Sequence, residues 1–68
     1  MEIVVNYCTS DNCRFNRTFR EADAKSNAEA FARAKVQYGC KWADVYDMET
    51  GEYLLAVRPN KIQKYGTN

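Results

Sequence analysis

Histidine is absent from this chain of 68 residues, and proline, glycine and cysteine are scarce, with one, three and three copies. Without histidine the chain lacks the commonest general base and the commonest metal ligand. Three thiols are too few for a tetrahedral zinc site, which takes four Cys or His ligands. Gly39, Gly51 and Gly66 lie too far apart to form a phosphate-binding loop. These absences predict a protein that is not an enzyme and that needs no metal or cofactor.

Long hydrophobic runs are also missing, since no apolar segment approaches the roughly 20 residues of a membrane-spanning helix. The segment from Met1 to Val5 lacks the basic start and long apolar stretch of a secretory signal. We therefore expect a cytoplasmic protein without membrane contact. In that compartment Cys8, Cys13 and Cys40 are expected to be reduced, as small buried or half-buried side chains. A Cys8–Cys13 disulfide across a turn remains the alternative.

Apolar residues form 46% of the chain and aromatic residues 13%, which is enough for a folded domain. The length predicts that residues 1–68 form one small domain. The formal net charge is +1, yet acidic residues concentrate between positions 44 and 52. Basic residues recur at every third position in two places. The two basic series are Arg14, Arg17 and Arg20, and Arg58, Lys61 and Lys64.

Two segments of alternating character predict a hairpin at the start of the chain. Within residues 2–8, Ile3, Val5 and Tyr7 fall on one side, as in a half-buried strand. Residues 9–12 are all turn formers, and residues 13–20 alternate again. On this second strand Arg17 interrupts the apolar side, which also carries Phe15. We expect the two strands to pair in antiparallel fashion.

A helix is predicted between Ser26 and Gly39. Ser26 and Glu29 have the spacing of a capping box, in which two side chains satisfy free N–H groups at the helix start. Gly39 can adopt the left-handed conformation that ends many helices. One broad side of the helix is apolar and rich in alanine, which predicts that it lies close to a sheet. The predicted members of that side are Ala24, Ala28, Phe31, Ala32, Ala34 and Tyr38.

Residues 41–46 and 52–58 predict a second hairpin, followed by a short edge strand at 62–65. In its turn we expect Gly51 at positive φ and the Asp47 carboxylate as an acceptor for backbone N–H groups. The element order thus predicts an α+β fold. A single helix packs on one face of a four- to five-stranded antiparallel sheet. The opposite face is then open, or is covered by the C-terminal tail or a partner.

Two registers are open for this second hairpin. A four-residue loop pairs Tyr46 with Tyr53, whereas a three-residue loop slides the pairing by one residue and joins Val45 with Leu55. We favour the four-residue loop because it accounts for Asp47 as well as for the turn glycine. The apolar face of the favoured register consists of Ala43, Val45, Leu54 and Ala56.

The candidate binding residues are basic or aromatic. The basic series can contact phosphates or an acidic protein surface, or else they form a solvated edge that prevents aggregation. The aromatic residues are typical interface anchors that also stack on nucleobases, or else they pack beneath Ile62 and Tyr65 of the tail. The predicted partner-binding residues are Arg14, Arg17, Arg20, Trp42, Tyr46, Tyr53, Arg58, Lys61 and Lys64.

Residues 28–57 resemble small phage-encoded anti-CRISPR proteins with one helix against an antiparallel sheet. The likeness rests on the Ala-Glu-Ala segment from Ala28 and the Glu-Thr-Gly-Glu-Tyr-Leu segment from Glu49. The resemblance implies a stoichiometric inhibitor that docks on a CRISPR surveillance complex and blocks its nucleic-acid channel. We therefore expect a non-enzymatic phage or mobile-element inhibitor whose partner is a host protein or ribonucleoprotein complex. The alternatives are a small nucleic-acid-binding domain that uses the same residues and a homodimer formed through the aromatic face.

Overall fold

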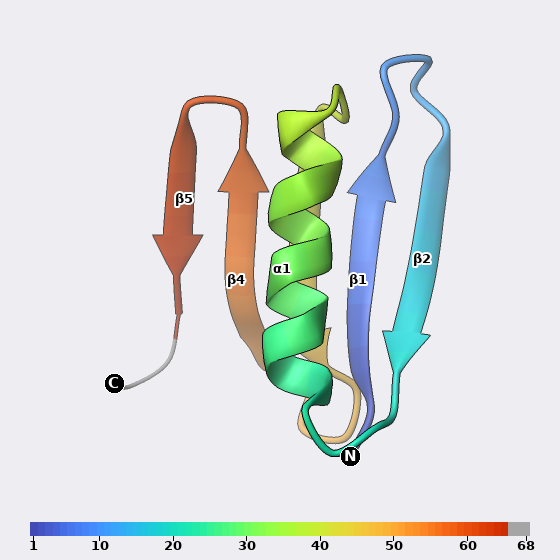
Figure 1. The fold of residues 1–68 in the computed structure, drawn as a ribbon, viewed down its shortest axis with the longest axis vertical. Helices are drawn as coiled ribbons and strands as arrows, with labels where there is room; N and C mark the ends of the chain where they lie inside the picture. Colours follow the sequence, from blue (N-terminus) through green and yellow to red (C-terminus); the bar gives the residue numbers. More distant parts are fainter. Residues whose placement is uncertain (66–68) are drawn as a thin grey trace.

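The computed structural model describes residues 1–65 and shows one α-helix and five β-strands (Figure 1). The elements follow one another as β1 (Ile3–Cys8), β2 (Arg14–Phe19), α1 (Ala24–Gln37), β3 (Trp42–Asp47), β4 (Tyr53–Arg58) and β5 (Lys61–Lys64). All neighbouring strands are antiparallel, in the spatial order β2-β1-β3-β4-β5. The predicted α+β class and the single antiparallel sheet are confirmed.

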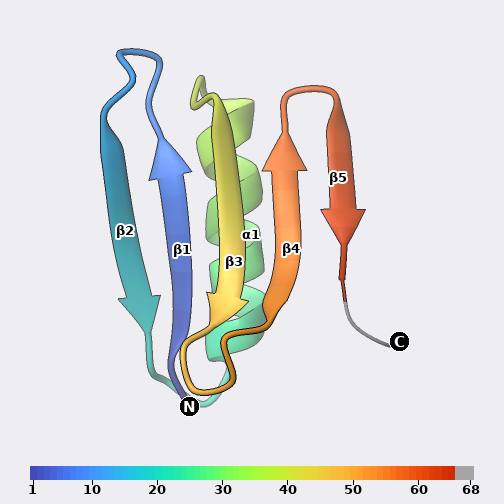
Figure 2. The same ribbon diagram turned by 180° about the vertical axis from the view of Figure 1, so that it is seen from behind.

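The helix covers one face of the sheet and leaves the other face bare. It packs on β1 and β3 at the centre of the sheet, touches β2 and β4 at its sides, and makes no contact with β5. Figure 2 shows the opposite face, over which no other element of residues 1–65 lies. We call this the open face. The helix side of the sheet therefore forms the core, whereas the open face is available for contact with other molecules.

The buried side of the helix is narrower than predicted. Ala24, Ala28 and Ala32 are fully buried against the sheet, and Val36 continues this series at the same four-residue spacing. The prediction that Ala34 and Tyr38 face the core is wrong, because both are exposed. Residues four apart lie almost above one another on a helix. The three alanines and Val36 therefore form one narrow row, and this row makes the contact with the centre of the sheet. Phe31 lies partly buried at the edge of this row.

The helix begins three residues earlier than predicted, and the capping box is not formed. Asp23 occupies the N-cap without a side-chain hydrogen bond, and the Ser26 hydroxyl lies in the first turn and donates to the Asp23 carbonyl at 3.1 Å. Asn27 instead ties this turn to the preceding loop, because its side-chain amide donates to Glu21 at 2.8 Å. That hydrogen bond is the main cause of the lowered pKa of Glu21. Backbone N–H groups, including that of Arg20, act in the same direction.

The end of the helix is as predicted, with Gly39 at a φ of +116°. The Gly39 N–H donates to the Val36 carbonyl, and the Cys40 N–H reaches back to the Lys35 carbonyl at 2.9 Å. These two bonds are those of a Schellman motif, which satisfies carbonyls left free by the end of the helix.

Replacing Gly39 with alanine is expected to destabilise the protein by about 1–2 kcal/mol, because a Cβ is disfavoured at this φ. A Cβ at Gly39 would meet nothing within 4 Å, so backbone strain is the only cost. Urea denaturation measures the effect, and Tyr38→Ala is the control. Since Tyr38 is 83% exposed, its loss should change stability by less than about 0.5 kcal/mol. Equal stability of Gly39→Ala and the wild type would contradict the assigned helix end.

The β3–β4 hairpin combines the two registers predicted from the sequence. At the turn Tyr46 lies opposite Tyr53, as favoured, but a bulge then shifts the pairing so that Val45 lies opposite Leu55. The prediction that Leu54 and Ala56 share the face of Ala43 and Val45 is therefore wrong, although Ala56 is also buried. The buried residues on the helix side are Ala43, Val45, Leu55 and Val57.

The turn itself confirms both sequence predictions. Gly51 has a φ of +78°, and its N–H donates to the Asp47 carbonyl at 2.7 Å. The Asp47 carboxylate accepts the Glu49 N–H at 2.9 Å. The Asp47 N–H donates to the Glu52 carbonyl, which closes the four-residue loop. The four-residue loop is thus compatible with the pairing of Val45 and Leu55, because Leu54 is the extra residue of a bulge in β4.

The β1–β2 hairpin forms as predicted, with Asn12 at a φ of +66° in its turn. All three cysteines are free, so the alternative of a Cys8–Cys13 disulfide is not realised. Cys8 is buried and Cys40 half-buried, but Cys13 is exposed, contrary to the expectation for this residue. Within residues 1–65 the structure contains no helix with the length and apolar character required to cross a membrane.

Candidate binding surface

Side chains alternate between the two faces along each strand, so the register shows which residues share the open face. Cys8 of β1 lies between Arg14 of β2 and Trp42 of β3. One step further across the sheet, Arg58 of β4 follows Trp42 and is paired with Lys61 of β5. A row of five side chains therefore crosses the whole sheet on its open face. We call its charged and aromatic members, Arg14, Trp42, Arg58 and Lys61, the cation–aromatic row.

Trp42 stands at the centre of this row between two guanidinium groups. The Arg14 Cζ lies 6.0 Å and the Arg58 Cζ 5.9 Å from the centroid of the indole ring, at the outer limit of cation–π attraction. The indole is half-buried, and both arginines are exposed. The Asp44 carboxylate fixes one of them by accepting a hydrogen bond from the Arg58 Nη1 at 2.8 Å. The row thus presents a flat ring whose cationic neighbours point into solvent.

Two tyrosines extend the open face toward the β3–β4 turn. The rings of Tyr46 and Tyr53 are 5.7 Å apart at a tilt of 57°, a normal geometry for a packed aromatic pair. Tyr46 lies opposite Val4 of β1, which is buried although it does not face the helix. Tyr53 is 52% exposed, so one ring of the pair is available for contact with another molecule. The open face therefore carries aromatic side chains at both ends of β3.

Three of the predicted binding residues do not join this surface. Arg17 lies on the helix side, with its Cζ 4.9 Å from the ring centroid of Phe19. Arg20 lies beyond the end of β2, where its Nε donates to Glu2 at 2.6 Å. Lys64 is paired with the core residue Leu55 and shares its helix-side orientation. A spacing of three residues suits a helical face, whereas in a strand it places successive side chains on opposite faces.

As far as Tyr65, the C-terminal tail does not cover Trp42. It forms β5 beside β4 in the plane of the sheet, and Ile62 lies opposite the core residue Val57, on the helix side. Tyr65 lines a shallow hollow together with Tyr53. Neither tail residue therefore packs over Trp42, which excludes this alternative for the centre of the row.

A second aromatic cluster, between α1 and β2, was not identified as a site from the sequence. Tyr7 stacks on Phe15 at 5.8 Å and meets Phe31 edge to face at 5.5 Å. Arg17 and Lys35 cover these rings, with the Lys35 Nζ 5.0 Å from the Tyr7 centroid. The alternation of residues predicts that Tyr7 and Phe15 lie on the apolar side of their strands. The contacts of Arg17 and Lys35 with the rings are seen only in the structure. Its rings serve mainly to extend the core.

Charged side chains lie at the surface throughout the described part of the chain, since no polar or charged residue there is buried. Among residues 1–65, no three Cys, Asp or Glu side chains lie close enough together to hold a metal ion. The open face is therefore the surface with the most distinctive chemistry, and it is suited to contact with anionic or planar groups. The chain matches no family model, no curated protein and no solved structure.

Proposed function

We propose that the protein is a non-enzymatic binding protein that uses the open face of its sheet to dock on an acidic surface of a larger complex. The observation that carries this proposal is the position of Trp42, half-buried between Arg14 and Arg58 on a face that no other element covers. Tryptophan, tyrosine and arginine are the residue types that most often dominate binding energy at interfaces.

The charge of the open face supports an acidic partner. The cation–aromatic row contains three cations, and within residues 1–65 Asp44 is the only acidic side chain that forms an ion pair with it. The cations Arg14 and Lys61 form no ion pair within residues 1–65. A partner that supplies carboxylates or phosphates opposite them would gain charge-assisted hydrogen bonds, which are stronger than neutral ones.

The partner we propose is a host defence or nucleoprotein complex, with the chain acting as a phage or mobile-element inhibitor. The resemblance of residues 28–57 to anti-CRISPR proteins supports this choice. In this proposal one chain binds to each complex and prevents the complex from binding its nucleic acid, and no covalent bond is made or broken.

Direct binding of single-stranded nucleic acid is the second candidate function. The observation that favours it is the flat arrangement of an indole ring and three cations in one row, since bases stack on aromatic rings while cations follow the backbone. Phosphate contacts release counterions, so the affinity for nucleic acid would fall steeply with salt. That dependence separates this candidate from docking on a protein surface.

The first experiment adds the purified chain to purified CRISPR surveillance complexes and measures cleavage or binding of target DNA. We expect inhibition to saturate at one chain per complex and to weaken at least about tenfold in both Trp42→Ala and Arg14→Glu, because each removes an anchor of the row. Lys25→Glu is the matched charge control. This exposed lysine at the start of the helix forms no ion pair in residues 1–65, so its variant should inhibit like the wild type.

The second experiment titrates single-stranded DNA and RNA of about 20 nucleotides against the chain at several salt concentrations. Trp42 is the only tryptophan, so its fluorescence reports directly on the proposed surface. Salt-sensitive quenching that Arg14→Glu abolishes would establish the nucleic-acid candidate in place of the inhibitor. If neither the complexes nor the nucleic acids respond to the wild-type chain, both forms of the proposal are wrong.

A further inference from the structure

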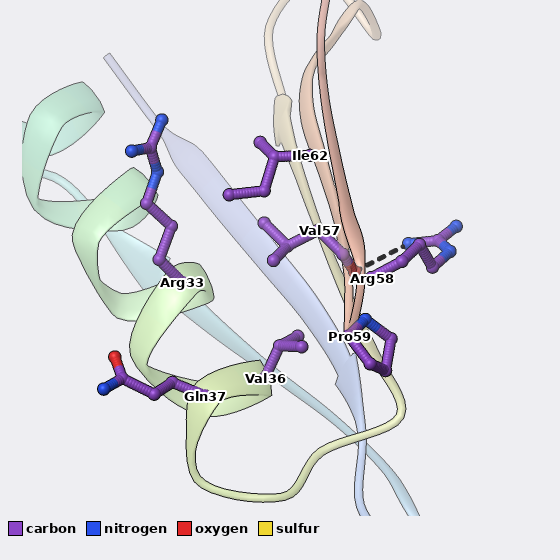
Figure 3. Close-up of a pocket in the computed structure, with 7 residues that line it drawn as sticks. All are labelled: Arg33, Val36, Gln37, Val57, Arg58, Pro59 and Ile62. Atoms are coloured by element: carbon purple, nitrogen blue, oxygen red, sulfur yellow. Dashed lines mark hydrogen bonds between the residues drawn. The ribbon is translucent and has the colours of Figure 1, made fainter.

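A groove separates the second half of α1 from the β4–β5 hairpin, on the helix side of the molecule. It has a volume of about 530 Å³. It exists because the helix lies over the centre of the sheet and makes no contact with β5. Figure 3 shows side chains from both elements on either side of the groove. The lining residues are Arg33, Val36, Gln37, Val57, Arg58, Pro59 and Ile62.

The chemistry of the groove is apolar at its floor and cationic at its rim. Val36 and Val57 form its base, and Ile62 faces the helix from β5 while remaining 50% exposed. Arg33 projects from the helix side, and the Arg58 guanidinium turns away to the open face (Figure 3). No acidic residue lines the groove. An occupant therefore needs apolar side chains on the side that faces the groove.

The outer edge of β5 offers the backbone groups that such an occupant can use. The Tyr65 N–H donates to the Leu54 carbonyl, so Tyr65 directs its backbone toward β4. In an antiparallel pair, alternate residues of a strand hydrogen-bond to the same neighbour. Ile62 and Lys64 consequently direct their N–H and C=O groups away from β4, to the free edge of the sheet. Their side chains lie on the helix side, and that of Ile62 lines the groove.

We propose that this edge and groove bind an extended, acidic segment of a partner protein, which adds to the sheet as a sixth strand beside β5. Main-chain hydrogen bonds to Ile62 and Lys64 would hold the segment, and its alternate apolar side chains would enter the groove. Acidic side chains in between would face Lys61 on the open side of the new strand.

Charge distinguishes this occupant from a second copy of the chain. β5 carries Lys61 and Lys64 and no acidic residue, so pairing between two β5 strands would bring like charges together. Lysines on a short edge strand are a common protection against such self-pairing. An acidic segment instead places its carboxylates opposite Lys61. The site shares Lys61 with the cation–aromatic row, but its edge and groove lie away from Trp42, so it does not depend on the function proposed for the open face.

The test uses a synthetic peptide, Glu-Val-Glu-Leu-Glu-Val-Glu, titrated into the ¹⁵N-labelled chain and followed by NMR. We expect saturable shifts at residues 57–64 and on the helix around Arg33 and Val36, with the Trp42 indole N–H unchanged. A peptide with lysine in place of every glutamate is the charge control and should bind at least fivefold more weakly. Absence of saturable shifts up to about 1 mM peptide, or shifts centred on Trp42, would overturn the proposal.

Two variants of the chain refine the same test. Lys61→Glu should weaken binding at least fivefold while leaving the fold intact, because Lys61 faces the acidic side of the segment, is exposed and forms no ion pair in residues 1–65. Ile62→Pro removes one of the two outward N–H donors without removing a bond to β4, and should also weaken binding. Lys25→Glu, at the opposite end of the helix, should bind the peptide like the wild type. Equal weakening by Lys25→Glu and Lys61→Glu would show that binding depends only on the overall charge of the chain, and the proposed site would be wrong.

Discussion

Replacing Leu55 with alanine is expected to destabilise the protein by about 2–5 kcal/mol, because a fully buried leucine is lost and a cavity remains. A domain of this size has a free energy of unfolding on the order of 5 kcal/mol, so the variant would be near the limit of folding. The melting temperature should fall by about 10–30 °C, as followed by circular dichroism.

Leu54→Ala is the matched control for this prediction, since it makes the same chemical change one residue earlier. Leu54 is only partly buried, and its loss should cost about 1 kcal/mol. The comparison tests the bulge in β4 directly, because the register favoured from the sequence would exchange the two residues. A larger effect at Leu54 than at Leu55 would show that the shifted pairing is wrong.

The second large effect is expected at the contact between helix and sheet. Ala28→Leu introduces a larger side chain where the existing one is fully buried against the strands, and should cost about 1–3 kcal/mol or more through overpacking. Helix propensity cannot explain such a loss, because leucine and alanine are both good helix formers. Chemical denaturation followed by circular dichroism gives the free energy of unfolding of the variant.

Ala30→Leu makes the same substitution two residues later, on the exposed side of the helix. Its stability should stay within about 0.5 kcal/mol of the wild type. If both variants were equally stable, the helix would have room to move away from the sheet, and the close packing through small side chains would be disproved.

Most of the architecture could be predicted from the sequence because its determinants are local. Alternation over residues 3–8 and 14–19 marks the first hairpin, and the positive φ of Gly39 and Gly51 follows from the absence of a side chain. These features act between neighbouring residues. They require no knowledge of what packs above or below the sheet.

The errors concern positions that only the assembled sheet determines. The capping box at Ser26 was displaced because Asn27 binds Glu21 of the preceding loop and starts the helix earlier. The bulge at Leu54 reconciles a four-residue turn with burial of Leu55, a compromise that neither loop length alone predicts. Contacts between residues distant in sequence therefore determine where the helix begins and how the strands pair, whereas the local sequence pattern determines which helices and strands form.

The candidate binding surface was predicted only in part for the same reason. Trp42 and Arg58 were recognised by residue type, but their alignment with Arg14 depends on β1 lying between β2 and β3. The regular spacing of the first basic series did not predict which face each arginine occupies. Arg17 lies within β2 on the helix side, where its Cζ is 5.1 Å from the ring centroid of Phe31. Strand order, which the sequence did not reveal, determines which cations are neighbours.

The pairing of β1 with β3 has a consequence for how the chain reaches this structure. Each hairpin closes over a few residues, but the seam between β1 and β3 joins segments that flank the entire helix. Contacts so distant in sequence carry a large entropy cost and slow the approach to the native state. During synthesis on the ribosome, one side of the first hairpin must therefore stay unpaired until residues 42–47 have emerged.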